Sequence, residues 1–193
     1  MSKLLVTGCL GFIGSYFCKY YLREHYNDTI IGLNRQTDSK NLRRIELLQT
    51  NPRFSMVTKD ITDDISGLFE GVDYVVHFAA KTFVDHSIRD PKPFIHSNII
   101  GTFNMLEEAR RSPWIKKFIY ISTDEVYGPI LEGAHKETSP LNPSNPYASA
   151  KAAGDMLALS YKTTYGVPII ITRTENNYGP YQYPEKLIPF FIT

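Results

Sequence analysis

The stretch V-T-G-C-L-G-F-I-G, residues 6–14, decides how this chain folds. It places Gly8, Gly11 and Gly14 three residues apart, directly after a short apolar run at residues 3–7 and at the start of a helical pattern. A strand, a tight glycine turn and a helix in this order let the backbone approach a bound pyrophosphate closely. The helix N-terminus then offers unpaired N–H groups to the phosphates. The segment therefore predicts dinucleotide binding.

Short apolar runs alternate with helical patterns along the rest of the chain, which is typical of a parallel sheet built from β-α-β units. The expected strands are residues 3–7, 29–33, 54–58, 74–78, 117–122 and 168–173. The expected helices are residues 12–26, 41–49, 65–69, 93–111 and 146–165. The predicted fold class is α/β, a doubly wound Rossmann fold with a mostly parallel sheet. Residues 128–145 and 175–193 do not fit the alternation and are expected to be loops over the strand ends.

Composition narrows the classes of function. With 193 residues, 42% of them hydrophobic and 21% charged, the chain reads as an ordinary globular protein. Its net charge of +1 gives no sign of a surface for nucleic acid or membrane, so neither partner is expected. Cys9 and Cys18 are its only cysteines, and no Cys/His set has the spacing of a zinc site, so we expect neither a disulfide nor a metal. No apolar run is long enough for a secretory signal or a membrane span, which predicts a cytoplasmic location.

Polar residues after the second and third expected strands bear on the cofactor. Asn34 and Arg35 stand where an acidic residue usually binds the adenosine ribose. An acidic residue would repel a 2′-phosphate, whereas Arg35 can pair with one, so NAD and NADP both remain open. Arg35 could instead belong to a solvated loop. Asp60 stands where an adenine contact is expected, or alternatively caps the next helix.

Tyr147 and Lys151 stand four residues apart in P-Y-A-S-A-K, so on a helix they share one face. A tyrosine phenol has a pKa near ~10, and a neighbouring ammonium would stabilise the phenolate and let Tyr147 act as a base near neutrality. In isolation, such a pair is usually a packing contact. Together with the glycine turn and the segment I-S-T-D-E-V-Y-G at residues 121–128, the pattern favours a catalytic pair.

Six segments resemble the extended short-chain dehydrogenase/reductase family, and most closely its dTDP-glucose 4,6-dehydratase branch. They are T-G-C-L-G-F-I-G, H-F-A-A, V-D-H-S-I, I-S-T-D-E-V-Y-G, P-Y-A-S-A-K-A-A-G-D and N-N-Y-G-P-Y-Q-Y-P-E-K-L-I-P, which together span nearly the whole chain. The T-D-E triplet and the last segment point to the dehydratases. The resemblance implies a nucleotide-sugar 4,6-dehydratase that converts an NDP-hexose to an NDP-4-keto-6-deoxyhexose by transient hydride transfer to bound NAD.

The resemblance also implies a catalytic role for five residues. Tyr147, supported by Lys151, would remove the proton of the sugar 4-hydroxyl, and Thr123 would hydrogen-bond to that oxygen. Glu125 as a carboxylate would take the carbon 5 proton, and Asp124, held protonated, would donate to the departing 6-hydroxyl. The alternative is that Thr123 or Asp124 only caps a helix after the strand.

Further binding positions are carried over from the family in the same way. The added cofactor positions are Phe12, Ile13, Ile61, Phe78, Ala79, Ala80, Lys81, Ser97 and Asn176. The substrate positions are Thr82, Thr123, Asn177, Glu185, Lys186 and Leu187. The charge of Lys186 would suit a diphosphate, although it could be an ordinary surface lysine. We expect His77 to be a packed, hydrogen-bonded residue.

Departures from the family leave some questions open. K-T-F at residues 81–83 stands where the family usually has a Glu and a His, and Glu175 replaces a usual Ser, so the exact sugar is open. Family chains continue into a smaller C-terminal lobe that is largely absent here. We therefore expect a Rossmann domain at residues 1–174 and the start of the substrate-binding region at residues 175–193. The family also implies a homodimer that pairs through the helices beginning at Pro93 and Pro146.

Two other readings stay open at this point. One is a nucleotide-sugar 4-epimerase or a UDP-glucuronate decarboxylase, which would use the same scaffold but would not need an acid at Asp124. The other is a non-catalytic NAD(P)-binding fragment or regulatory protein, because a Rossmann fold does not by itself establish chemistry.

Overall fold

The computed structural model describes residues 1–35, 42–184 and 186–192. In this part of the chain, six strands form one sheet in the order β3-β2-β1-β4-β5-β6, and every pairing is parallel. Each expected strand is present with both ends within one residue of its predicted position: β1 Lys3–Thr7, β2 Thr29–Asn34, β3 Phe54–Thr58, β4 Tyr74–His77, β5 Lys117–Thr123 and β6 Ile169–Thr174. The predicted α/β fold class is confirmed.

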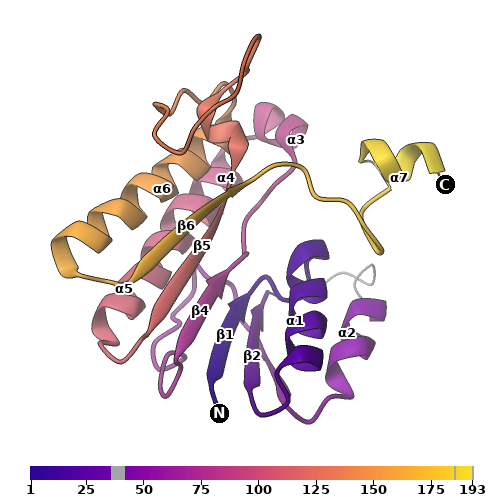
Figure 1. Ribbon diagram of the computed structural model, residues 1–193, viewed down its shortest axis with the longest axis vertical. Coiled ribbons are helices and arrows are strands. Elements are labelled where there is room, and N and C mark those ends of the chain that lie inside the picture. The colour runs from indigo at the N-terminus through magenta and orange to yellow at the C-terminus, as the bar shows by residue number, and fades with distance from the viewer. Residues whose placement is uncertain (36–41, 185, 193) are drawn as a thin grey trace.

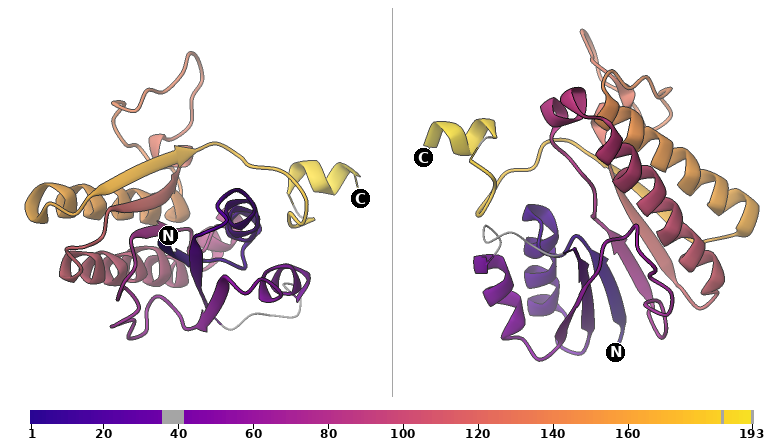
Figure 2. Two further views of the ribbon diagram at one scale, coloured as in Figure 1. Left: turned by 60° about the horizontal axis from the view of Figure 1, so that its bottom comes forward. Right: turned by 180° about the vertical axis from the view of Figure 1, so that it is seen from behind.

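Helices cover both faces of the sheet (Figures 1 and 2). Helices α1 (Phe12–Glu24) and α2 (Leu42–Gln49) pack over β1, β2 and β3, while α5 (Thr102–Arg111) and α6 (Pro146–Tyr165) lie on the opposite face. One apolar cluster joins β1 to α1, and a second joins β5 to α5 and α6. Strands buried on both faces need nearly continuous apolar runs, which is why the sequence displayed them so clearly.

The long helix expected at residues 93–111 is three elements in succession. A short helix α4 (Lys92–Ile95) leads into a π-helical segment η2 (His96–Gly101), which runs on into α5. Within η2, Asn98 is 1% exposed, and its amide bonds both the backbone N–H and the carbonyl of Lys81, at 2.8 and 2.9 Å. The π-helical segment therefore fastens the loop after β4 to the helical layer.

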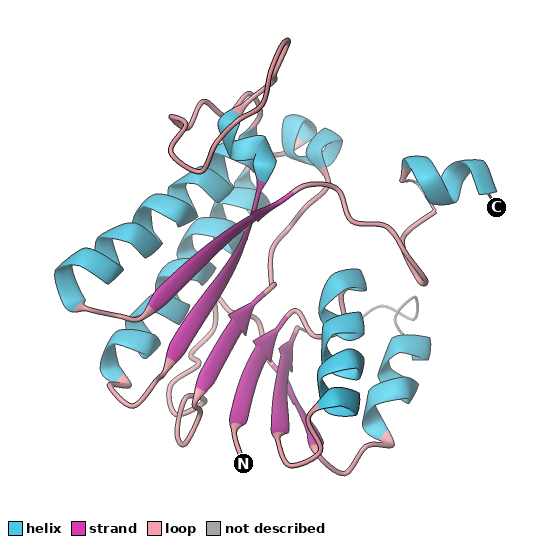
Figure 3. Cartoon of the chain, in the orientation of Figure 1, coloured by secondary structure: helices cyan, strands magenta, loops and turns pink. Residues whose placement is uncertain are grey.

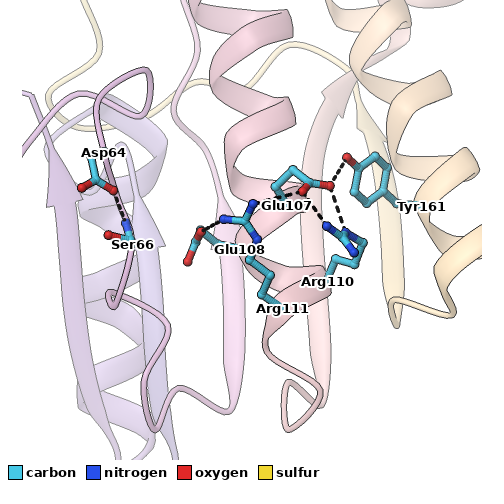
Figure 4. Close-up of polar contacts among 7 residues, drawn as sticks. All are labelled: Asp64, Ser66, Glu107, Glu108, Arg110, Arg111 and Tyr161. Atoms are coloured by element: carbon cyan, nitrogen blue, oxygen red, sulfur yellow. Dashed lines mark hydrogen bonds and ion pairs between the residues drawn. The ribbon is translucent and has the colours of Figure 1, made fainter.

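The helix expected at residues 65–69 is wrong, because the chain makes turns there. Gly67 has a φ of +79°, a left-handed conformation that ends a right-handed helix. The Asp64 carboxylate also accepts a bond from the backbone N–H of Ser66 at 2.9 Å, as an Asx turn does (Figure 4). Ile65 and Phe69 are nevertheless buried, so their apolar spacing reflects core packing rather than a helix.

Two other segments close the upper edge of the sheet. Residues 128–145 form a loop without helix or strand beyond the carboxyl ends of the strands, as expected (Figure 3). After β6, the chain crosses towards the α1 side and reaches a short helix α7 (Leu187–Ile192) inside a segment predicted to be a loop. A second unpredicted helix, α3 (Val84–Arg89), follows β4.

Among the described helices, none has the length and apolar character needed to cross a bilayer.

Candidate active site

A cavity of about 840 Å³ lies at the carboxyl ends of the strands. Its walls come from the glycine turn, the ends of β2 and β5, the loops after β3, β4 and β6, and the start of α6. Every described residue that the sequence assigned to a site lines this cavity, except Leu187. Leu187 opens α7, is 74% exposed and is not part of the cavity lining, so its expected position beside the substrate stays a prediction. Glu185 lies outside the described residues.

The glycine turn has the shape that a phosphate cradle requires. Gly8 has a φ of +66°, and a Cβ on Gly14 would lie only 2.3 Å from the carbonyl oxygen of Gly8. Neither position can carry a side chain without moving the backbone. Gly11 precedes α1, and none of the described side chains caps this end of the helix. The N-terminus of α1 therefore presents its N–H groups and positive dipole end to the cavity.

On the cavity wall beyond this turn, Asn34 and Asp60 both have protein partners. The Oδ1 of Asn34 accepts from the backbone N–H of Leu10 at 3.3 Å, and its Nδ2 donates to the carbonyl of Arg35 at 2.8 Å. The Oδ1 of Asp60 accepts from the N–H and the hydroxyl of Thr62 at 3.0 and 2.9 Å. The capping alternative for Asp60 thus describes its bonding, although it caps a turn and not a helix.

Lys151 is 3% exposed and reaches the floor of the cavity. Its Nζ donates to the carbonyl of Ile121 at 2.7 Å and lies 4.1 Å from the centre of the Tyr120 ring. Burial lowers the pKa of Lys151 to about 8, and the negative charge of Asp155 opposes this shift. Since a pKa of about 8 still exceeds neutrality, most Lys151 side chains carry a proton at pH 7.

Tyr147 is 8% exposed, and its phenol meets the T-D-E triplet across the cavity. Burial raises the pKa of Tyr147 to about 12, the charges of Glu125 and Asp124 also raise it, and a hydrogen bond with Thr123 lowers it. Lys151 is not among the groups that shift this pKa. The reason is that its ammonium is bound to a backbone carbonyl, while desolvation dominates at the phenol.

The T-D-E triplet forms the start of a 3₁₀ turn, η3 (Asp124–Tyr127), directly after β5. The Thr123 hydroxyl accepts from the backbone N–H of Glu125 at 3.3 Å and donates to the Asp124 carboxylate at 3.0 Å. Thr123 is thus an N-cap residue, as its alternative reading stated. The Glu125 carboxylate accepts from the side-chain amide of Asn145, the N-cap residue of α6, at 3.1 Å.

A buried ion pair that sequence reasoning missed holds these segments together. Arg173 of β6 binds Asp155 of α6 at 2.7 Å, and it donates to the Tyr127 hydroxyl at 2.6 Å and to the Glu137 carbonyl at 3.3 Å. The Asp155 side chain is 0% exposed. The pair therefore joins β6, α6, η3 and the loop of residues 128–145. No local pattern reveals it, because its members lie far apart in the sequence.

The cavity includes further residues that the sequence did not assign. His86 and Arg89 lie three apart on α3, and the His86 ring packs edge-on against Phe83 at 4.4 Å. The segment V-D-H-S-I and its helical spacing could have identified them. The other unassigned residues of the lining are Leu33, Lys59, Phe83, Asp90, Pro93, Phe94, Ile121, Ser122, Thr174, Glu175, Gln182 and Tyr183.

His77 lies beneath the cavity as a core residue, as predicted. It is 1% exposed, and its two ring nitrogens contact the hydroxyls of Thr7 and Thr102 at 2.7 and 3.2 Å. Burial, followed by the charge of Lys151, lowers the pKa of His77 to about 3, so the ring is neutral at pH 7. Within the described ranges, His, Cys, Asp and Glu side chains form no group of three that could hold a metal ion.

Comparison with known proteins identifies a family and its structures. A profile of the family described as GDP-mannose 4,6 dehydratase matches residues 5–193. The dTDP-glucose 4,6-dehydratase of Streptomyces niveus is 45% identical over 197 residues, which cover 99% of this chain and 58% of the relative. The crystal structure of dTDP-glucose 4,6-dehydratase from Bacillus anthracis in complex with NAD has a TM-score of 0.90 at 41% identity, over 100% of this chain and 60% of that one.

An epimerase structure is similar as well. UDP-glucuronic acid 4-epimerase from Bacillus cereus, in complex with UDP-glucuronic acid and NAD, has a TM-score of 0.91 at 34% identity, over 97% of this chain and 60% of that one. The family profile and the two dTDP-glucose 4,6-dehydratases confirm the resemblance to the dehydratase branch at the level of family. The chain spans only 58 to 60% of the length of these three relatives.

Proposed function

The chain belongs to the GDP-mannose 4,6 dehydratase family, and from this premise we propose that it carries the NAD-binding and catalytic part of a nucleotide-sugar 4,6-dehydratase. In this proposal, residues 1–174 form the Rossmann domain, and residues 175–193 begin the region that binds the substrate. One observation carries the proposal: Tyr147, Lys151 and the T-D-E triplet line the same cavity as the glycine turn.

NAD is the proposed cofactor, since it is present in the similar dehydratase and epimerase structures. The turn at Gly8 and Gly14 is so tight that a Cβ on either glycine would meet the backbone of Ala79 or of Gly8. It brings the N-terminus of α1 to the cavity wall, where the free N–H groups fit a diphosphate. Asn34 and Arg35 would face the adenosine ribose, Asp60 and Ile61 the adenine, and Ser97 and Asn176 the nicotinamide end. When bound, NAD would accept a hydride from carbon 4 of the sugar and later return it to carbon 6.

Proton transfers would be performed by residues of the chain. Tyr147 would take the proton of the 4-hydroxyl, with Thr123 bonded to the same oxygen. Because the pKa of Tyr147 is about 12 in this structure, the phenol needs the Lys151 charge closer to it to act as a base near pH 7. Glu125 would then remove the carbon 5 proton, Asp124 would protonate the 6-hydroxyl, and water would leave.

The T-D-E triplet favours dehydration over epimerisation. Elimination of water requires one group that accepts a proton and one that donates a proton, and Glu125 and Asp124 supply both at one turn. Exchange of configuration at carbon 4 needs the Tyr/Lys pair but neither of these two carboxyl groups. The similarity to an epimerase at 34% identity therefore supports the shared fold, cofactor and Tyr/Lys pair, but not the same reaction.

Turnover of candidate substrates tests this proposal. The 193-residue chain is incubated with NAD and, in separate reactions, with dTDP-glucose, UDP-glucose, CDP-glucose and GDP-mannose, and products are weighed by mass spectrometry. We expect loss of one water from at least one of them. Asp124→Asn should leave oxidation at carbon 4 measurable while slowing elimination by at least ~10²-fold. An isomer of unchanged mass would support the epimerase, and NAD binding without turnover would support the non-catalytic fragment.

A homodimer and a cytoplasmic location complete the proposal. Apolar side chains on η2, α5 and α6 are 40 to 48% exposed, which supports pairing through this helical layer: Ile100, Phe103, Met156 and Leu159. The proposed cytoplasmic location fits a chain whose two cysteines, Cys9 and Cys18, are both buried. Sedimentation analysis should give twice the chain mass, and Phe103→Asp should lower it to one chain mass.

A further inference from the structure

The first turn of α6 is fastened from two directions. The Oδ1 of Asn145 accepts from the backbone N–H of Ala148 at 2.8 Å, and the Ser87 hydroxyl of α3 accepts from the N–H of Tyr147 at 3.2 Å. Pro146, the first helical residue, has no N–H to satisfy. The segment that carries Tyr147 therefore begins at a defined place.

The bond to Ala148 determines which way the Asn145 amide faces. A backbone N–H can only donate, so the side-chain oxygen must point towards Ala148 and the NH₂ group must point away from the helix. That NH₂ group donates to Oε2 of Glu125 at 3.1 Å. One amide thus spans the start of α6 and the carboxylate of a residue twenty positions earlier in the chain.

Glu125 keeps one oxygen free in this arrangement. Oε2 is bonded to Asn145, whereas Oε1 makes no hydrogen bond or ion pair with the described residues. The carboxylate lines the cavity and is close enough to Tyr147 for its charge to raise the pKa of that phenol. The two groups are therefore coupled, and the coupling depends on where Glu125 is held.

We propose that Asn145 is a positioning residue that caps the Tyr147 helix with one atom and holds the Glu125 carboxylate with the other, which leaves Oε1 free to accept a proton from the substrate. This inference rests on the proposed function and adds a residue to its site. Asn145 touches neither substrate nor cofactor in this role, and acts only through Glu125 and α6.

Two substitutions of Asn145 keep its N-cap bond and remove its bond to Glu125, and a third, at Ser87, is the control. Asn145→Asp keeps an N-cap oxygen for Ala148 but turns the donor into a second carboxylate that faces Glu125. Asn145→Ser also keeps an N-cap, and its shorter side chain loses the bond to Glu125. Ser87→Ala serves as the structural control, because it removes the other fastening of α6 and leaves the Asn145–Glu125 bond in place.

The first readout does not depend on catalysis. Titration of the Glu125 side-chain carboxyl is followed by ¹³C NMR of the intact chain, with the signal assigned by Glu125→Gln. Two carboxylates that share a site do not both ionise readily, so Asn145→Asp should raise the titration midpoint of the pair by at least ~1 pH unit. Ser87→Ala should leave it within about 0.3 of the native value, on the same physical argument.

The second readout separates the chemical steps. With a nucleotide hexose that turns over, Asn145→Asp and Asn145→Ser should slow exchange of the carbon 5 hydrogen with solvent by about 10-fold or more. Oxidation at carbon 4, followed by nicotinamide absorbance at 340 nm, should fall much less. The pH profile of elimination should move upward only in Asn145→Asp.

An unchanged carboxyl midpoint in Asn145→Asp overturns the inference whether or not the chain is active. Equal losses of elimination in Asn145→Ser and Ser87→Ala also overturn it, since they would show a merely structural effect. A shifted midpoint in a chain that turns over none of the nucleotide hexoses would support the Asn145–Glu125 coupling and count against the proposed function alone.

Discussion

Two polar networks in this protein use the same three kinds of side chain in different surroundings. At the strand ends, Asp155 binds Arg173, which also donates to the Tyr127 hydroxyl. On the outer helical layer, Glu107 binds Arg110 at 2.8 Å and accepts from the Tyr161 hydroxyl at 2.5 Å (Figure 4). The inner carboxylate is 0% exposed and its arginine 16%, whereas the outer pair is 18% and 38% exposed.

The two networks differ in whether water can solvate a charge that has lost its ion-pair partner. Water can reach Glu107 and Arg110, which also stand only three residues apart on one helix, so their pairing changes stability little. Water cannot reach Asp155, and its partner comes from another layer of the fold. Removing Arg173 would leave the Asp155 carboxylate buried without its counter-charge, and removing Asp155 would leave Arg173, which is only 16% exposed, without a carboxylate partner. Both are the costly case.

Removal of the inner carboxylate should give the largest effect. Asp155→Ala should lower the free energy of unfolding by about 3–5 kcal/mol, because Arg173 stays in place without its counter-charge. Urea unfolding followed by circular dichroism measures the change. The double variant with Arg173→Met should recover part of this loss, since it removes the stranded charge. A loss below ~1 kcal/mol in the single variant would show that the inner pair behaves like a surface pair.

Acid should destabilise the interior before it reaches the outer network. The pKa of His77 is lowered by burial to about 3 from an ordinary value of 6.5, so the unfolded chain binds a proton that the folded chain excludes. The contribution of neutral His77 to the free energy of unfolding is therefore full above pH 6.5, and it is lost as the pH drops from 6.5 towards 3. We expect a loss on the order of 2 kcal/mol between pH 7 and pH 4.5. His77→Gln should flatten this dependence, and an unchanged slope would contradict the assignment.

The outer network should show a smaller effect in a more acidic window. Bonds from Arg110 and Tyr161 lower the pKa of Glu107 to about 2 from 4.5. Its contribution is present above pH 4.5 and is lost as the pH falls from 4.5 towards 2. Glu107→Gln should reduce stability at pH 7 by about 1 kcal/mol in thermal or urea unfolding, and a loss as large as that of Asp155→Ala would remove the contrast between the networks.

The smallest effect is expected at the neighbouring glutamate. Among the described residues, Glu108 pairs with Arg111 alone, at 3.0 Å on the same helix. Arg111 also lies 3.5 Å from Glu107. Glu108→Gln should change stability by no more than ~0.5 kcal/mol at low salt, and by less at 0.5 M salt. It is the matched control for Glu107→Gln, and equal losses in the two variants would mean that the Arg110 and Tyr161 bonds of Glu107 contribute nothing.

Elements with a local sequence pattern could be predicted. The buried parallel strands and the helix of residues 146–165 have such patterns, and their predicted ends lie within one residue of the observed ends. Residues 65–69 misled the prediction, because Ile65 and Phe69 have helical spacing while Gly67 takes a left-handed conformation. An apolar pattern indicates which residues are buried, whereas the backbone conformation decides whether they lie in a helix, a strand or a turn.

The candidate site divides in a similar way. The glycine turn, the T-D-E triplet and the Tyr/Lys pair are contiguous or helically spaced motifs, so the sequence could indicate them. The Asp155–Arg173 pair and the Asn145–Glu125 bond join distant segments and could not be seen before the fold. The direction of the Tyr147 pKa shift could not be predicted for a related reason, since desolvation depends on the whole surrounding structure.

The π-helical segment η2 changes the direction in which side chains point along the continuous run of α4, η2 and α5. One extra residue in its wide turn puts the helix before it out of phase with the helix after it. Asn98 can therefore face the loop of Lys81 while Met105 and Leu106 still face the sheet. Deleting a single residue from this turn would make α4, η2 and α5 one regular helix. Either Asn98 would then lose its bonds to the loop of Lys81, or Met105 and Leu106 would leave the core.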